Sequence, residues 1–228
     1  MVNMFKCFDN KFIDEVEETI AKWNLSKTNK SEFLKLRTYY NSNIYNLSDR
    51  KKSVILYCLL THAFNYQIAF NSKNEYNMPS GAGRSYFSPQ LREKLVKYIH
   101  RKDEINISFV NQDFIDISID KLPPAKDTFI YADPPYLITT GAYERDYFCK
   151  WSEDYEIKLL DFLDTLSSNG YKFALSNVLE HKGKSNNLLK EWSKKYKVHY
   201  LKMNYKNCNY QTKNKSANSS SEVLIVNY

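Results

Sequence analysis

Apolar residues recur at helical spacing through the first third of the chain, which holds no glycine or proline before Pro79. The spacing predicts a helix that ends near Trp23, a second that starts at Ser31 and a third, longer one that starts near Asp49. On one face of the first of these helices lie Phe12, Ile13, Val16 and Ile20. The third contains VILYCLLTHAF, which is shorter than the roughly 18 residues of a membrane span and therefore predicts a buried helix.

A further helix is expected to begin at Ser88-Pro89, because proline is favoured at the first helical position. From Ile105 onward the pattern changes to short β-type runs that alternate with helical ones. The predicted strands are INISFV (105–110), TFIYA (128–132), YKFALS (171–176), VHYLKM (198–203) and EVLIVNY (222–228). Helices are predicted over 152–166 and 185–196, and a loop near Asn214. This alternation indicates an α/β fold with a doubly wound sheet, which binds ligands at the carboxyl ends of its strands.

Composition narrows the class of protein. The chain has 228 residues, enough for one large domain or two small ones, and a formal charge of +7, which favours a polyanionic partner such as nucleic acid. With no signal peptide or membrane span, we expect a cytoplasmic protein without a membrane partner. Neither a metal site nor a disulfide framework is expected, because the histidines are isolated and the cysteines stand singly, at Cys7, Cys58, Cys149 and Cys208.

The segment from Phe64 to Phe87 mixes aromatic, amide and basic side chains and holds the first proline and two early glycines. It is expected to form an irregular or hairpin-like loop. Such side chains contact base edges and phosphates in protein–DNA complexes, but a solvated surface loop can have the same composition. At this point both interpretations stand.

The tetrad Asp133-Pro134-Pro135-Tyr136 follows the predicted strand TFIYA directly, at the edge where an α/β sheet places its site. A rigid turn with a capping aspartate is the purely structural interpretation. The chemical interpretation concerns an aromatic amine such as that of adenine, which is a poor nucleophile and needs acceptors aimed at its N–H groups. Asp133 and the carbonyl of Pro134 supply preorganised acceptors, and the ring of Tyr136 offers a face on which a base flipped out of the duplex can stack.

Five segments follow one another along the chain: FNYQIAFNSKNEYNMPSG, NQDF, YADPPYLIT, FALSNV and EVLIVNY. With these segments in this order, the sequence resembles the Dam-type (class α) DNA adenine-N6 methyltransferases over essentially all of its length. The resemblance implies a methyltransferase (Rossmann-like) α/β sheet, S-adenosyl-L-methionine as cofactor and double-stranded DNA as substrate. It implies a catalytic role for Asp133, Pro134, Pro135 and Tyr136, and cofactor contacts for Asp113, Phe114 and Asp133. For Asp113, a helix or turn cap at the end of a strand is the alternative.

The resemblance also divides the chain into three parts. Residues 1–30 would be an N-terminal helix of the catalytic domain, 31–104 a mainly helical target-recognition region, and 105–228 the α/β catalytic domain that carries DPPY. In the recognition region, contacts to DNA are expected from Asn65, Lys73, Asn77 and Arg84. Dam itself has an arginine that reads a guanine where this chain has Ala69, so the resemblance does not carry over a target sequence.

A second departure concerns the cofactor loop. Family members begin with a strand and a glycine-rich loop, whereas Gly81-Ala82-Gly83, the first glycines here, follow Met78-Pro79-Ser80 rather than a strand. The sheet is therefore expected to be incomplete at its N-terminus, by about one βαβ unit of about 30 residues. We expect truncation of an adenine methyltransferase; the alternatives are a split enzyme, completed by a second chain that supplies the strand and loop, and a remnant that only binds DNA.

Two rival functions are compatible with the same motifs. One is a non-catalytic DNA-binding protein whose DPPY pocket stays empty, which cofactor binding would distinguish from an enzyme. The other is methyl transfer to cytosine N4 or to a glutamine side chain of a protein, since related tetrads serve those amines. The helical insertion before DPPY and the order of the segments favour adenine by resemblance.

Overall fold

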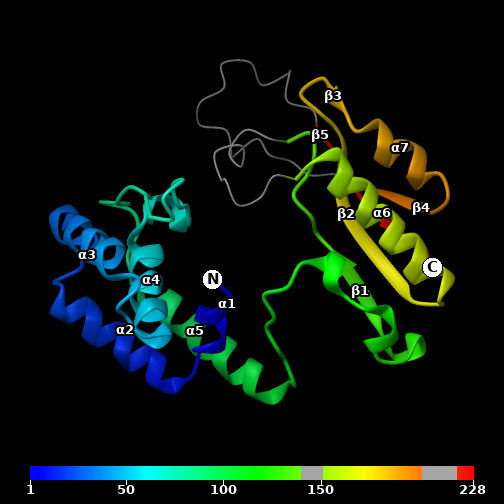
Figure 1. Cartoon of the computed structure of the whole chain (residues 1–228). Helices are drawn as coiled ribbons and strands as arrows, with labels where there is room; N and C mark the ends of the chain where they lie inside the picture. The colour runs from blue at the N-terminus through cyan, green and yellow to red at the C-terminus, as the bar shows by residue number, and fades with distance from the viewer. Residues whose placement is uncertain (140–150, 202–219) are drawn as a thin grey trace. The chain divides into compact units, whose positions relative to one another are not determined.

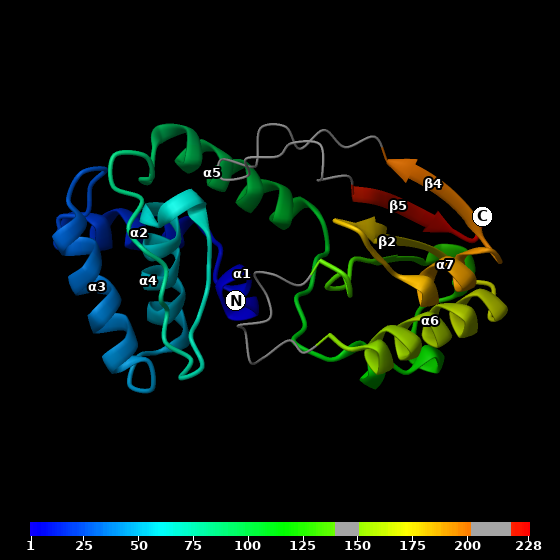
Figure 2. The same cartoon turned by 90° about the horizontal axis from the view of Figure 1, so that it is seen from above.

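The computed structural model describes residues 1–139, 151–201 and 220–228 and divides the chain into two compact units, 1–111 and 112–228. Both units are drawn in Figures 1 and 2 and are described separately. Outside the described residues lie Cys149, Cys208, Gly141, the predicted loop near Asn214 and the last two residues of the predicted strand 198–203. Among the helices described, none has the length and apolar character needed to cross a membrane.

The N-terminal unit is built from α-helices. The predicted helix end near Trp23 and the predicted starts near Ser31, Asp49 and Ser88-Pro89 are confirmed, but the third predicted helix is not longer than the second, since each has 14 residues. The helices are α1 (Val2–Lys6), α2 (Asn10–Lys22), α3 (Lys30–Asn43), α4 (Asp49–His62) and α5 (Pro89–Glu104). Ser48 and Ser88 begin α4 and α5, since each hydroxyl oxygen accepts a hydrogen bond from a backbone N–H in the first turn. Pro89 is the first residue of α5, where its missing N–H costs nothing.

Helix α4 contacts α1, α2 and α3. The predicted burial of this helix is confirmed, because the side chains of Cys58 and Leu59 are completely inaccessible to solvent. The same core includes Phe12, Val16, Leu36 and Ile99. Helices α1 and α2, which contain most of residues 1–30, therefore pack within this helical unit.

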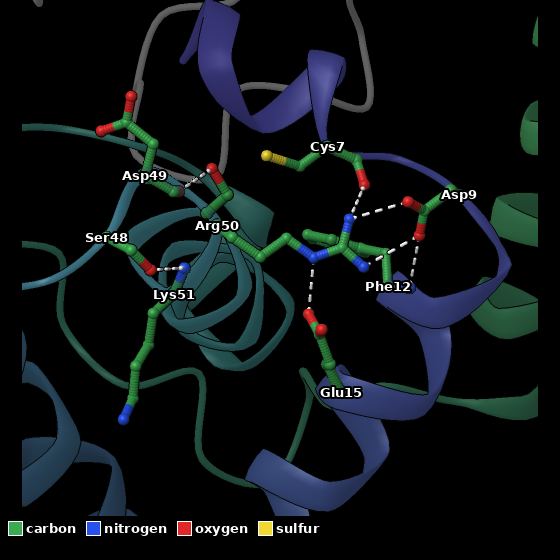
Figure 3. Close-up of polar contacts among 9 residues, drawn as sticks. Cys7, Asp9, Phe12, Glu15, Ser48, Asp49, Arg50 and Lys51 are labelled. Carbon is green, nitrogen blue, oxygen red and sulfur yellow. Dashed lines mark hydrogen bonds and ion pairs between the residues drawn. The ribbon is translucent and has the colours of Figure 1, made fainter.

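Arg50 of α4 holds the loop between α1 and α2 (Figure 3). Its guanidinium donates to the two carboxylate oxygens of Asp9 at 2.8 and 2.9 Å, to Glu15 at 2.6 Å and to the carbonyl oxygen of Cys7 at 2.6 Å. Asp9 also caps α2, because its Oδ1 accepts from the backbone N–H of Phe12 at 2.8 Å. Hydrogen bonding to Arg50 holds the pKa of Asp9 below its ordinary value despite the opposing effect of burial.

Acidification is expected to weaken this unit through Asp9. A carboxyl whose pKa is lowered by folding stabilises the folded chain above its ordinary pKa, and this contribution is lost as the pH falls below about 4. Asp9→Asn keeps an oxygen that can cap α2 but removes the charge, so the variant should lose less stability between pH 5 and pH 3 than the wild type. The urea midpoint of the helical circular dichroism signal, followed over this range, measures the difference. Equal losses in both proteins would contradict the role given to the Arg50–Asp9 pair.

The C-terminal unit contains one mixed sheet in the strand order β1-β2-β5-β4. The strands are β1 (Phe129–Ala132), β2 (Lys172–His181), β4 (Lys197–Leu201), β5 (Ser220–Val226) and a short β3 (Lys184–Ser185), which pairs with β2. Strands β1 and β2 are parallel, whereas β5 is antiparallel to both β2 and β4. The predicted α/β class is confirmed; the sheet is mixed because β5 runs against both of its neighbours, a direction that hydrophobic periodicity does not report.

Helices α6 (Glu153–Ser168) and α7 (Asn187–Ser193) lie on the same face of this sheet, as both views show. Between helices and sheet lies the second core, which is formed by Leu159, Leu163, Leu166, Phe173, Leu175, Leu189, Trp192, Val223 and Ile225. The predicted end of α6 is confirmed: Asn169 closes it, and Gly170 follows with a φ of +80° that glycine adopts without strain. The connection from β1 through α6 to the parallel strand β2 is the βαβ unit that positions the site.

Three predicted elements differ from the structure, one of them being the strand 171–176, which is part of the longer strand β2. Residues 105–110 form no strand; Ile105, Ile107 and Val110 are exposed by 40, 42 and 67%. A β-type run becomes a strand only where a neighbouring strand takes its backbone hydrogen bonds, and no described strand pairs with this run. The helix predicted over 185–196 is shorter, because Ser185 belongs to β3 and Asn186 caps α7 with its side chain.

Candidate functional site

The DPPY tetrad follows β1 directly, as the sequence predicts. Because β1 and β2 are parallel, the carboxyl ends of both strands meet at the tetrad's edge of the sheet. Within the tetrad, the phenol of Tyr136 donates a hydrogen bond to Oδ1 of Asp133 at 3.1 Å. Burial, followed by the negative charge of Asp133, raises the pKa of Tyr136 above its ordinary value, so the phenol keeps its proton at neutral pH.

A cavity of about 410 Å³ lies beside the tetrad and joins two of the predicted motifs. Asp133, Pro134 and Pro135 form one part of its lining, and Asp113 and Phe114 form another. The rest comes from Gln112, Ile117, β1, Trp151 and the α6 residues Leu159, Phe162 and Leu163. Tyr136 is not among the described residues that line this cavity, although its phenol bonds Asp133, which is.

Aromatic rings make up much of the cavity wall. The ring of Phe114 lies 6.0 Å from that of Trp151 and 6.2 Å from those of Tyr155 and Phe162, in tilted and edge-on arrangements. None of Trp151, Tyr155 and Phe162 was predicted as a site residue. One signal was present: Trp151 directly precedes Ser152, which caps α6, and an apolar residue before a cap commonly packs against the first turns of its helix.

Asp113 acts as a cap, the alternative raised for it. Its Oδ1 accepts from the backbone N–H of Ile115 at 3.2 Å and so begins the short 3-10 helix Phe114–Asp116. The hydroxyl of Tyr155 reaches Oδ2 at 3.5 Å, the outer limit for a hydrogen bond. Asp113 remains exposed and lines the cavity, so the cap orients the carboxylate at the rim; its contact with a cofactor stays a prediction.

The segment 64–87 forms the hairpin-like loop that was predicted. Antiparallel bridges pair Ala63 with Ser80 and Phe70 with Tyr76, and a tight turn follows Asn71. The predicted DNA contacts are all exposed, namely Asn65, Lys73, Asn77 and Arg84. Asn65 and Tyr66 have φ values of 53 and 55°, which residues other than glycine seldom adopt. A Cβ on Gly81 would lie 2.7 Å from the carbonyl oxygen of Ala63, so this glycine serves a close backbone approach within the hairpin.

Helix α3 supports the hairpin through side chains that the sequence analysis did not identify. The amide of Asn41 bonds the backbone of Tyr76 twice: Oδ1 accepts from its N–H at 2.9 Å, and Nδ2 donates to its carbonyl oxygen at 3.0 Å. Arg37 donates to the carbonyl oxygen of Met78 at 2.9 Å. The ring of Tyr76 is only 1% exposed and packs edge-on against Phe70. The hairpin is therefore held by its backbone, which leaves its outward side chains available.

Comparison with known proteins shows the family of this chain. Residues 1–207 match the sequence model of the family described as D12 class N6 adenine-specific DNA methyltransferase. The chain belongs to this family. Relatives include the type II methyltransferase M.FokI of Planomicrobium okeanokoites, with 44% identity over 227 residues, and the modification methylase StsI of Streptococcus sanguinis, with 41% over 233. Each alignment covers 99% of this chain but only 33 and 34% of the relative.

The match extends to a third modification methylase, LlaI of Lactococcus lactis subsp. lactis, at 34% identity over 80% of this chain. The chain thus spans about a third of the length of these relatives, as 33, 34 and 28% of each are covered. The resemblance drawn from the motifs is confirmed at the level of the family, which comprises S-adenosyl-L-methionine-dependent DNA methyltransferases.

The cavity fits the cofactor of this family. Its volume of about 410 Å³ lies in the range of small-molecule sites, roughly 300–1,000 Å³. Phe114, Ile117 and Phe162 offer apolar faces to an adenine ring, while the carboxylates of Asp113 and Asp133 complement hydroxyl groups and the positive charge of a sulfonium cofactor. Asp113, Phe114 and Asp133, the predicted cofactor residues, all lie in this one lining.

Proposed function

We propose that this chain carries the catalytic tetrad and part of the cofactor site for methyl transfer from S-adenosyl-L-methionine to the N6 amine of a flipped adenine in double-stranded DNA. The observation that carries the proposal is the shared cavity, which places Asp133-Pro134-Pro135 against Asp113-Phe114. When bound, the cofactor supplies an electrophilic methyl group. The family match supports adenine N6, rather than cytosine N4 or a glutamine amide, as the acceptor.

The tetrad's part is to hold the amine. The carboxylate of Asp133 and the carbonyl of Pro134 accept its two N–H groups, which orients the nitrogen lone pair toward the methyl group. With the cofactor bound, formation of the N–C bond would accompany breaking of the bond between the methyl group and sulfur, leaving a neutral thioether. The amine nitrogen would become positively charged, and these acceptors would stabilise that charge until a proton passes to solvent. The two prolines restrict the backbone, so the acceptors are in place before the base arrives.

The division of labour between the units is also part of this proposal. We assign the hairpin of the N-terminal unit, with Asn65, Lys73, Asn77 and Arg84, to contacts with the DNA target, and the C-terminal unit to catalysis. Exposed amide and basic side chains on a hairpin held by its backbone suit base-edge and phosphate contacts. Residues 1–30 pack within the helical unit, and we assign them to the support of that unit.

A second chain that supplies a parallel strand and a glycine loop remains part of the proposal. Among the described strands, β1 pairs only with β2, and its side chains Phe129 and Tyr131 are 53 and 59% exposed. A strand edge of this kind presents unpaired N–H and C=O groups and accepts an added strand. The glycine loop following such a strand would reach the cofactor cavity at the carboxyl end of β1.

The test is transfer of tritiated methyl from S-adenosyl-L-methionine to unmethylated double-stranded DNA, with the modified base identified afterwards. The purified chain is assayed alone and with a separately produced fragment that supplies the expected strand and glycine-rich loop. N6-methyladenine from either mixture supports the proposed activity, and formation only with the fragment supports the second chain. Specific DNA binding without cofactor binding or incorporation in both mixtures would instead favour a non-catalytic DNA-binding protein.

Tyr136 is expected to contribute by stacking on the flipped base. Tyr136→Ala should weaken binding of DNA with an extruded adenine by about 1–3 kcal/mol, or roughly 5- to 150-fold, as for other base–aromatic contacts. Tyr136→Phe keeps the ring and loses only the hydrogen bond to Asp133, so it should lie closer to the wild type. Fluorescence of 2-aminopurine at the target position reports the extruded base. A Phe variant weaker than the Ala variant would contradict the stacking role.

A further inference from the structure

Glu156 is a buried carboxyl group without a role in the reaction as described so far. It lies in α6 and its side chain is completely inaccessible to solvent. Three donors converge on it: Oε2 accepts from the indole N–H of Trp151 at 2.5 Å, and Oε1 accepts from the amides of Asn177 at 3.2 Å and Asn186 at 2.9 Å. Burying an acidic side chain costs free energy unless its oxygens are hydrogen-bonded. The convergence of three donors therefore indicates that a carboxyl group is specifically needed at this position.

The position of Glu156 in its helix shows why it can contact Trp151. Ser152 caps α6, so Trp151 precedes the cap and Glu156 is the fourth helical residue. These two positions commonly hold an apolar pair that packs together. Here the pair is joined by a hydrogen bond instead, which fixes the direction of the indole ring as well as its distance from the helix.

The ring that is fixed in this way is a wall of the cofactor cavity. Trp151 lines the cavity, the bond to Glu156 is the one that its indole N–H makes among the described residues, and its ring lies 6.0 Å from Phe114 and 5.8 Å from Tyr155. Resting on the function proposed above, we propose that Glu156 is a positioning residue that sets the Trp151 indole, and thereby the shape of the cofactor cavity.

The orientation of both amides on Glu156 is itself determined. Oδ1 of Asn177 accepts from the backbone N–H of Val178 at 2.8 Å, and Oδ1 of Asn186 accepts from the backbone N–H of Leu189 at 3.1 Å. Neither amide can turn its oxygen toward Glu156 without losing that bond. Through them, the indole is connected to the middle of β2 and to the cap of α7.

Glu156→Gln therefore has one predictable effect. The glutamine oxygen must face the two amides, so its NH₂ group faces the indole N–H, and two donors cannot bond each other. The indole should move while the rest of the helix stays in place. Trp151→Phe removes the indole N–H and with it this conflict. Glu153→Gln, an exposed change in the first turn of the same helix, is the matched control for lost charge.

The experiment combines a readout without ligand and one with ligand. The indole ¹H–¹⁵N signals of Trp23, Trp151 and Trp192 are recorded on the full chain, with Trp151→Phe assigning one of them. Affinity for S-adenosyl-L-methionine is measured by calorimetry in all variants. We expect Glu156→Gln to shift the Trp151 signal and to weaken binding about tenfold in the wild-type background, but less than about twofold in the Trp151→Phe background; Glu153→Gln should change neither quantity.

Several results would overturn the positioning role. An unchanged Trp151 signal in Glu156→Gln would do so, as would an equal loss of affinity in both backgrounds. Unfolding of the chain by Glu156→Gln in both backgrounds would assign Glu156 to folding alone. If Glu156→Gln shifts the indole signal but the wild type binds no cofactor either alone or with the added strand and glycine loop, the positioning of Trp151 is supported and the proposed function is contradicted, so the two failures are distinguishable.

Discussion

Replacing Asp133 with asparagine should lower methyl transfer to adenine by at least about 100-fold, because groups that stabilise charge developing in a transition state contribute on the order of 10²- to 10³-fold each. The variant keeps the size of the side chain and one oxygen, but it presents an NH₂ group and no negative charge to the reacting amine. The bond from the phenol of Tyr136 can still be accepted by the remaining oxygen, so the tetrad should keep its shape. Initial rates of tritium transfer, in the mixture that shows activity with the wild type, measure the effect.

DNA binding is the comparison that gives this result its meaning. Asp133 acts on a base and not on phosphates, so the affinity of Asp133→Asn for duplex DNA should stay within about threefold of the wild type. Asp120→Asn, an exposed change in the same unit and outside the cavity lining, should leave both activity and binding unchanged. Ordinary turnover by Asp133→Asn would refute the role assigned to the carboxylate.

Asn41→Leu should loosen the recognition hairpin and weaken DNA binding by at least about tenfold. Leucine has a similar size but no polar atoms, so the N–H and carbonyl of Tyr76 lose their partners, at a cost of about 1–2 kcal/mol for each group. The exposed side chains of the hairpin are untouched by this change. Fluorescence anisotropy of labelled duplex DNA measures affinity, and amide hydrogen exchange at Tyr76 measures the loosening.

The same helix offers a control for this prediction. Asn43 donates its side-chain amide to the carbonyl of Tyr39 within α3 and does not contact the hairpin in any described hydrogen bond. Asn43→Leu should therefore leave both the exchange rate of the Tyr76 amide and the DNA affinity close to wild type. If Asn41→Leu accelerates exchange without lowering affinity, the hairpin is not the DNA-contacting element.

Local signals were sufficient to predict most helices of this protein. A capping serine before α4, a Ser-Pro pair before α5 and an Asn-Gly pair after α6 each act over a few residues, so their effect can be read without knowing the fold. The strand before DPPY was predicted from its β-type run of residues, and it forms because β2 pairs with it. The run 105–110 failed because its apolar character needed a neighbouring strand, which no local signal supplies.

The sequence by itself determined the family, the order of the motifs and the tetrad at the end of β1, because these depend on residue type and adjacency along the chain. Only the tertiary structure decided which residues surround the site. Trp151, Glu156 and Asn177 meet across α6 and β2, and Asn41 reaches Tyr76 from a different helix, so these contacts exist only after separate elements pack. Strand direction in the mixed sheet was likewise decided by pairing, since alternation of apolar residues is the same for a strand running either way.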